Sequence, residues 1–294
     1  MRLETAVDPA PAAGADFWHS LRRSRAAAAA ATLLAVFFCV AAFAGQIAPR
    51  DPQKTSHHTL RPPSPEFWFG TDDLGRDVFS GVVHGARTSI AIGLAVALFG
   101  GIIGVLVGSA AGYAGGLIDD VLMRLTEAFL VPPRFFLALV VVALFGSTYC
   151  NLILVLSVIY WPLTARLVRA EVMSLRERSF VEAARAVGAG HARILLHEIL
   201  PNALPLIVTK VVLMVGGVIL VEAGLSFIGL GDANNMTWGY MLHNGQHFIR
   251  DAWWMLLFPT LAVSSLVFAL NVLGDALNRA LDPRARVDYL DKPA

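Results

Sequence analysis

The stretch from Thr88 to Gly116 reads TSIAIGLAVALFGGIIGVLVGSAAGYAGG and decides the fold class of this chain. It contains no Asp, Glu, Lys or Arg, and it exceeds the roughly 20 apolar residues that a helix needs to cross a bilayer. Hydrocarbon offers no partner to unpaired backbone amides and carbonyls, so such a stretch is stable there only as a helix. The sequence therefore predicts an all-α membrane protein.

Five further apolar stretches have the length of a membrane-spanning helix. Together with the first, the predicted spans cover residues 26–47, 88–114, 121–145, 152–168, 204–225 and 252–273. The composition agrees, since 56% of the 294 residues are hydrophobic, 15% are charged and the mean hydropathy is +0.62. A signal peptide is the rival interpretation of the first span, but its apolar stretch and its leader are both long for a cleaved one. We expect residues 26–280 to form one transmembrane domain.

Positive charges predict the orientation, because short loops rich in Lys and Arg stay in the cytoplasm. Arginines cluster before the first span, after the last span and between the fourth and fifth, whereas the loop between the fifth and sixth holds only Arg250. The long segment 46–87 balances its cations with acidic residues and is placed outside. The tails 1–25 and 281–294 are therefore predicted to be cytoplasmic, with the chain in the bacterial inner membrane.

Two segments are expected to rest on membrane surfaces. An apolar residue recurs at every fourth position at Leu74, Val78, Val82 and Ala86, which predicts a helix with one apolar stripe on the outer leaflet. In the N-terminal tail, Phe17, Trp18 and Leu21 beside Arg22 and Arg23 predict an interfacial helix on the inner surface. We interpret both segments as anchors to lipid.

The second span carries a row of glycines with a strict spacing of four, and these are Gly100, Gly104, Gly108, Gly112 and Gly116. Such a row gives the helix one smooth face along which another helix backbone can approach closely. The partner helix belongs either to this chain or to a second permease-like subunit. In the third span, Pro132 and Pro133 remove backbone donors and predict a bend, either static or part of a path that opens.

The chain lacks the residues that would supply energy for transport. A P-loop needs a lysine in a GxxxxGK[ST] arrangement, but Lys54, Lys210 and Lys292 are preceded by Gln, Thr and Asp. Ion-coupled carriers keep ionisable groups deep in the bilayer, whereas residues 88–116, 135–165, 211–221 and 252–274 contain no Asp, Glu, Lys or Arg. Glu222 lies near a span end and is expected at the membrane interface. A carrier is disfavoured, and a passive channel remains an alternative.

Other classes of function find little support. A net charge of +1 gives no excess of cations to neutralise nucleic-acid phosphates. No GxSxG elbow, HExxH motif or intramembrane aspartate pair indicates an enzyme. His243 and His247, like the adjacent His57 and His58, lack a nearby carboxylate or cysteine to complete a metal site, so we predict none. The isolated Cys39 and Cys150 are expected to be core-facing thiols.

The loop 169–203 reads RAEVMSLRERSFVEAARAVGAGHARILLHEILPNA and predicts two short helices lying between two spanning ones. Ser174 with Glu177, and Ser179 with Glu182, fit the capping box, so a helix is expected to start at Phe180. Gly188 suits the left-handed residue that ends a helix. A second helical stretch, 191–200, leads to Pro201, which suits the turn into the fifth span.

Several of these residues resemble the EAA signature of importer permeases, and they are Glu182, Ala183, Ala184, Gly188, Leu200 and Pro201. In that family the loop is a coupling helix that fits a cleft on the ATPase subunit and carries its closing motion to the membrane. The resemblance assigns ATPase coupling to these six residues and to Ser179. The chain departs from the signature three residues before the proline, where Glu198 replaces the usual aliphatic residue.

Further motifs resemble the second-permease branch of the dipeptide/oligopeptide/nickel group of ATP-binding-cassette importers. They are FGTD at 69–72, LGRD at 74–77, GAR at 85–87, DDVLMR at 119–124, EAGLSFIGLG at 222–231 and DPR at 282–284. The resemblance implies a type I importer fold, with a second permease, two ATPase domains and an extracellular binding protein as partners. It places ATP and Mg²⁺ on the ATPases, with no cofactor on this chain. Peptides are the implied cargo, and nickel or another small solute is the alternative.

Overall fold

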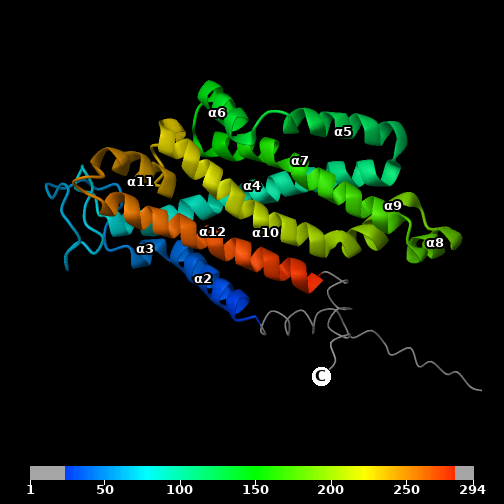
Figure 1. Ribbon diagram of the computed structural model, residues 1–294, viewed down its shortest axis with the longest axis horizontal. Coiled ribbons are helices and arrows are strands. Elements are labelled where there is room, and N and C mark those ends of the chain that lie inside the picture. The colour runs from blue at the N-terminus through cyan, green and yellow to red at the C-terminus, as the bar shows by residue number, and fades with distance from the viewer. Residues whose placement is uncertain (1–23, 282–294) are drawn as a thin grey trace, which may run out of the picture.

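The computed structural model describes residues 24–281, where the assigned elements are all helices (Figure 1). They are α2 Arg25–Ala42, α3 Ala44–Ile47, α4 Val78–Ala114, α5 Gly116–Leu130, α6 Arg134–Phe145, α7 Tyr149–Arg176, α8 Ser179–Ala186, α9 His191–Arg193, η1 Ile194–Ile199, α10 Leu200–Leu225, η2 Ser226–Leu230, α11 Trp238–Gly245, η3 Gln246–Phe248 and α12 Trp254–Leu281. Five stretches of this part of the chain are long and apolar enough to cross a membrane, and α5 with α6 make a sixth as a bent pair. The interfacial helix predicted at Phe17, Trp18 and Leu21 lies outside the described residues.

The long helix α4 begins ten residues before the predicted second span. Its N-cap is Asp77, whose buried carboxylate accepts a hydrogen bond from the Ser80 backbone N–H at 2.9 Å. The helix then continues unbroken into the span, so the separate outer-leaflet helix predicted for residues 74–86 is wrong. Val78, Val83 and Ala86 are buried, and Gly85 lies against Trp238. Of the stripe residues, Val78 and Ala86 therefore pack on protein and Val82 is partly buried, whereas Leu74 precedes the helix and is exposed.

Four glycines of α4 allow α7 to approach its backbone. A β-carbon would lie 3.2 Å from the Ser157 carbonyl at Gly100 and 2.6 Å from the Thr164 Cβ at Gly104. At Gly108 it would lie closer still, at 2.4 Å from the Ala165 carbonyl oxygen. The partner helix of this face therefore belongs to the same chain.

The same face continues to Gly112 but not to Gly116. A β-carbon at Gly112 would lie 2.6 Å from the Arg169 carbonyl, whereas one at Gly116 would have nothing within 4 Å. The prediction that Gly116 packs with the row is wrong. The helix ends at Ala114, and Gly115 and Gly116, with φ of +68° and +55°, turn the chain into α5.

The third predicted span is broken in two. α5 and α6 are bent by 81° across the segment that contains Pro132 and Pro133. Each proline lacks a backbone donor and clashes with a preceding carbonyl, so the adjacent pair disfavours a continuous helix. Both halves lie along α7 (Figure 1). The bend brings the first residue of α6, Arg134, over the ring of Tyr160 in α7.

Glu222, which the sequence predicts at the membrane interface, is buried by protein near the end of α10. Only 1% of its surface is exposed, and one carboxyl oxygen accepts a hydrogen bond from the Ser226 hydroxyl at 2.7 Å. α11 covers this turn of the helix, because Gly239 lies directly against Ala223 and Ser226.

Cys39 and Cys150 are both exposed, against the expectation that they face the core. Hydrophobicity placed these residues in the correct segments but did not determine which face of each helix is buried.

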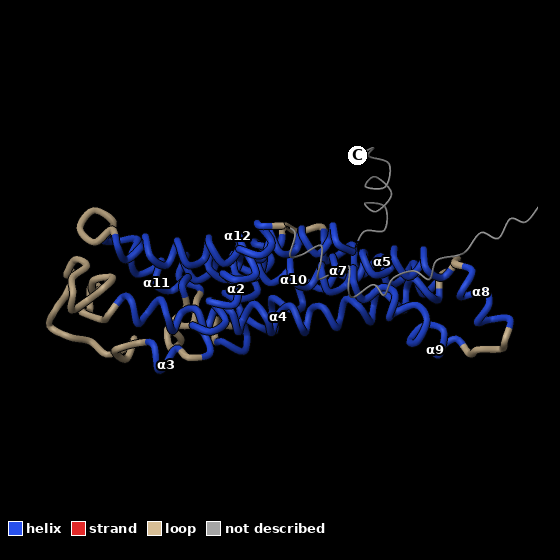
Figure 2. The backbone as a smooth tube through the Cα atoms, turned by 90° about the horizontal axis from the view of Figure 1, so that it is seen from below, coloured by secondary structure: helices blue, strands red, loops and turns tan. Residues whose placement is uncertain are grey.

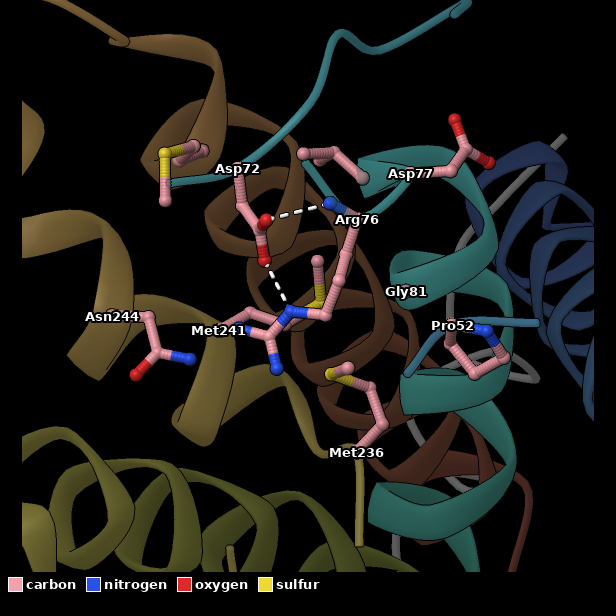
Figure 3. A pocket seen from close by; sticks show the side chains of 10 residues that line it. Pro52, Asp72, Arg76, Asp77, Gly81, Met236, Met241 and Asn244 are labelled. Atoms are coloured by element: carbon pink, nitrogen blue, oxygen red, sulfur yellow. Dashed lines mark hydrogen bonds and ion pairs between the residues drawn. The ribbon is translucent and has the colours of Figure 1, made fainter. Parts of the chain in front are cut away.

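The segment between α3 and α4 forms an ordered loop at one end of the bundle, opposite α8 and α9 (Figure 2). Figure 3 shows the Asp72 carboxylate accepting hydrogen bonds from the Arg76 backbone at 2.8 Å and from its guanidinium at 2.5 Å. Burial raises the pKa of the Asp72 carboxyl, although Arg76 acts in the opposite direction. Trp254 of α12 donates to the Thr71 carbonyl at 3.0 Å. The loop is thus held by both ionic and neutral hydrogen bonds.

We expect Gly108→Ala to lower the thermal midpoint of the purified protein in mild detergent. The added methyl group meets a backbone carbonyl that cannot rotate away, and such overpacking costs about 1–3 kcal/mol. Gly45→Ala is the matched control, because nothing lies within 4 Å of its β-carbon. Equal midpoints for the two variants would contradict a tight α4–α7 contact.

Candidate functional site

The candidate site is the segment 169–203, from the end of α7 to the start of α10, which the sequence predicts to be cytoplasmic and which is named here the coupling loop. It forms the end of the bundle opposite the ordered loop between α3 and α4 (Figure 2). α7 extends to Arg176, α8 follows after a short turn, and α9 runs through η1 into α10. One short helix therefore projects between two long ones.

The capping boxes predicted in this loop are wrong. Ser174 lies inside α7, and Ser179 is the first residue of α8 rather than its N-cap. The N-cap is Arg178, which has extended dihedral angles (φ −85°, ψ 149°) and makes no side-chain capping bond. Glu182 lies in the first turn, where its negative charge favours the helix N-terminus. The helix starts close to the predicted position for a different reason.

Gly188 ends α8 in the left-handed conformation that the sequence predicts, with φ of +83°. Its N–H donates to the Arg185 carbonyl, and the Ala189 N–H donates to the Ala184 carbonyl, both at 3.0 Å. This pair of bonds is the Schellman motif, which satisfies the last free carbonyls of a helix. The chain direction after α8 therefore depends on a residue without a side chain.

Pro201 does not form the turn predicted before the fifth span. Pro201 is the second residue of α10, and residues 191–230 form one helical stretch. The preceding turn, η1, is a π-helix, in which the Leu200 N–H donates to the Leu195 carbonyl five residues back. This wider turn lies next to Pro201, which has no backbone N–H to donate. The helix therefore continues through Pro201 without a change of direction.

The residues of the EAA resemblance divide between two faces of α8. Val181 is fully buried, and Ala184 packs with it against a cluster that contains Val172, Ile194 and Ile199. The opposite face is exposed and presents Phe180, Glu182, Ala183 and Val187. Val187 is 83% exposed. One face of α8 fixes it to the bundle, and the other is free to contact a partner.

Three side chains that the sequence analysis passed over hold the coupling loop to the bundle. The Tyr113 hydroxyl, at the end of α4, lies 3.0 Å from the His191 Nδ1 of α9. Arg176 donates to the Tyr113 carbonyl at 3.0 Å. These contacts tie α4, α7 and α9 together at one point. Spacing could not reveal them, since Tyr113 and His191 are far apart in the chain.

An ion pair fixes the start of α5 beside α7. Two guanidinium nitrogens of Arg169 donate to the two carboxylate oxygens of Asp119, each at 2.5 Å. Bidentate pairs of this kind are directional as well as strong. Asp119 belongs to the DDVLMR motif, which is the sequence signal that could have found this contact.

The histidines of the outer end do not gather into a metal site. The rings of His243 and His247 are 6.1 Å apart, and the His243 Nδ1 lies 2.8 Å from the Phe227 carbonyl oxygen. Within residues 24–281, no group of three or more His, Cys, Asp or Glu residues is placed to hold a metal ion.

Comparisons with known proteins agree with one family. Residues 104–287 match the family model described as "binding-protein-dependent transport system inner membrane component". Residues 13–63 match "N-terminal TM domain of oligopeptide transport permease C".

Curated relatives cover nearly the whole chain. The dipeptide transport system permease protein DppC of Alkalihalophilus pseudofirmus is 37% identical over 96% of this chain and 92% of its own. The glutathione transport system permease protein GsiD of Shigella flexneri is 40% identical over 92% of this chain and 90% of its own.

A solved structure shares the fold. It is a chain of the MetNI methionine ABC transporter in an inward-facing conformation, with a TM-score of 0.56 and 22% identity. The match covers 69% of this chain and 96% of that chain. The all-α fold predicted from the sequence is therefore confirmed as that of a type I importer permease.

We expect Tyr113→Phe to loosen the attachment of α9. Loss of one hydrogen bond costs about 0.5–1.5 kcal/mol, which should speed amide exchange across residues 191–199 by roughly 3- to 10-fold. Hydrogen–deuterium exchange with mass spectrometry measures this. Tyr149→Phe is the control, since the Tyr149 hydroxyl makes no hydrogen bond within residues 24–281. Unchanged exchange in Tyr113→Phe would show that the contact does not hold α9.

Proposed function

This chain belongs to the family of binding-protein-dependent transport system inner membrane components, and from that premise we propose that it forms half of the translocation pathway of an ATP-driven importer of di- or oligopeptides. The other half is a second, homologous permease. Two ATP-binding-cassette domains on separate chains hydrolyse ATP, and an extracellular binding protein delivers the substrate. The chain itself performs no catalysis, and both of its termini are cytoplasmic.

The exposed face of α8 is the observation that carries this proposal. It presents Glu182, Ala183 and Val187 on a short helix whose other face is anchored to the bundle. A small helix with an apolar, exposed face is suited to a cleft on another protein. The ATPase subunit is the partner that occupies this position in importers of this family.

The substrate class follows from the relatives and not from the coupling loop. The names of the relatives give dipeptides and glutathione as their cargo, and both are short peptides. They align with more than nine-tenths of this chain. Short peptides are therefore the cargo that we propose here.

Force applied to α8 has two direct routes into the membrane. Only two residues, Glu177 and Arg178, separate α7 from α8. η1 continues directly into α10 without a loop. Helices transmit displacement over their whole length because their packed turns are stiff. Closure of the ATPases would thus move α7 and α10 together and change access to the pathway between the permeases.

We expect Ala183→Arg to reduce co-purification of the ATPase subunits at least tenfold, because it places bulk and charge on the exposed face of α8. Affinity purification of the tagged chain in mild detergent, with ATPase activity assayed in the eluate, measures this. Ala233→Arg is the matched control, since Ala233 is exposed in the loop before α11, at the opposite end of the bundle. ATPase retained by Ala183→Arg would contradict docking at α8, and its absence from the unaltered chain would contradict the proposed function.

A second pair of variants tests coupling rather than docking. Gly188→Leu forces a branched side chain into a left-handed conformation, at a cost of about 1–2 kcal/mol. Gly188→Asn is tolerated better, because asparagine adopts this conformation more readily. We expect the leucine variant to transport less substrate per ATP hydrolysed, with the asparagine variant close to normal. Equal transport by both would show that the end of α8 is not critical.

A further inference from the structure

Arg134 and Lys210 are cations inside the candidate membrane spans. Arg134 is the first residue of α6, at the bend between the two halves of the broken span. Lys210 lies well within α10, which runs from Leu200 to Leu225. Charged side chains at such depth are costly, and they usually mark a substrate or ion pathway.

Neither cation has an anionic partner in the described part of the chain. The ion pairs within residues 24–281 involve other arginines, and no hydrogen bond is formed there by the side chain of Arg134 or Lys210. Both side chains are partly buried rather than open to their surroundings. A buried or partly buried cation without a partner favours the approach of an anion.

The two cations border one continuous surface. The Arg134 guanidinium lies 5.5 Å from the centroid of the Tyr160 ring, and the Tyr160 hydroxyl donates to the Gly217 carbonyl at 2.9 Å. Gly217 is seven residues after Lys210, so both lie on the same face of α10.

Two glycines leave this face of α10 without protruding side chains. One further repeat of seven residues leads to Gly224, where a β-carbon would lie 3.0 Å from the ring of Phe135. At Gly217 a β-carbon would lie 3.7 Å from Tyr160, which is ordinary contact. The face therefore consists of two glycines under aromatic rings, with a cation from each helix beside it.

The electrostatics favour an anion at this surface. Through Tyr160, Arg134 lies toward the face of α10 that carries Lys210, and like charges repel each other more strongly where water is scarce. An anion placed between them relieves the repulsion and replaces the hydration that each cation has lost. A carboxylate fits best, since guanidinium groups bind it through two parallel hydrogen bonds.

We propose that Arg134 and Lys210 form a carboxylate-binding subsite of the translocation pathway, next to the face of α10 marked by Gly217. This assignment rests on the proposed function, because a peptide supplies the anion. The carboxylate comes either from the C-terminus of the peptide or from an acidic side chain. The two sources share one chemistry, and the experiment separates them.

The test measures uptake by the whole transporter in proteoliposomes, with the binding protein saturated by each substrate. A dipeptide with a free C-terminus is compared with its C-terminal amide, and a dipeptide containing Asp with its Asn counterpart. We expect Arg134→Gln and Lys210→Gln each to reduce the preference for the carboxylate form about tenfold, with little change for the neutral form. Lys54→Gln, which removes an exposed cation from the outer loop, is expected to keep the preference.

Each outcome has a definite meaning. If the preference changes only between the dipeptide and its C-terminal amide, the subsite binds the C-terminal carboxylate. If it changes only between the Asp and Asn dipeptides, the subsite binds an acidic side chain. Equal loss for charged and neutral substrates, or an unchanged preference, overturns the subsite while leaving the proposed function intact. Loss of the partner permease on purification also overturns it, because the cations then pair with that subunit. Absence of ATP-dependent uptake by the unaltered transporter is instead a failure of the proposed function.

A second measurement does not depend on transport. Gly217→Cys is introduced with Cys39→Ala and Cys150→Ala, since both native cysteines are exposed. The introduced thiol at position 217 is treated in parallel with an anionic thiosulfonate reagent and with a cationic analogue of similar size, and the two reaction rates are compared. We expect the anionic reagent to react faster, and this preference to fall when Arg134→Gln is added. No reaction with either reagent, or no preference, overturns the proposal.

Discussion

The close contact between α4 and α7 is the constraint on which the rest of the structure depends. Helices in lipid gain little from hydrophobic burial, so their association depends on close packing of backbones and small side chains. Gly100, Gly104, Gly108 and Gly112 allow this approach by leaving one face of α4 without side chains. Because α4 ends at Tyr113–Ala114 and α7 ends at the coupling loop, the same contact aligns the end of the bundle that carries this loop.

That alignment gives the coupling loop a rigid base on three sides. Val181 buries one face of α8, the Tyr113–His191 contact holds α9, and the Asp119–Arg169 pair fixes the start of α5. The loop joins α7 and α10 without a flexible linker on the α10 side, since η1 continues the helix. A displacement of α8 would therefore reach both long helices at once.

The sequence predicted the membrane helices well and the local details of the loop poorly, for physical reasons. Hydrophobic length is sufficient to identify a span, because backbone groups in lipid must be satisfied within the helix. Gly188 was predicted because a left-handed residue favours glycine wherever it occurs. Ser179 and Pro201 were assigned to the wrong local structures, because α8 is held by tertiary packing and a π-turn accommodates the proline. The burial of Glu222 was not predicted, since hydropathy does not reveal which face of α10 another helix covers.

The pair formed by Arg134 and Lys210 shows a different limit of sequence analysis. Each lies one residue outside a charge-free stretch, 135–165 or 211–221, although each falls inside a predicted span, 121–145 or 204–225. Only the 81° bend between α5 and α6 places Arg134 over Tyr160, and thereby beside the face of α10 that carries Lys210. The prolines that cause the bend were evident in the sequence, but their consequence depends on α7 and α10 being held together. The bend thus brings Arg134, from one predicted span, toward the face of α10 that carries Lys210, from another.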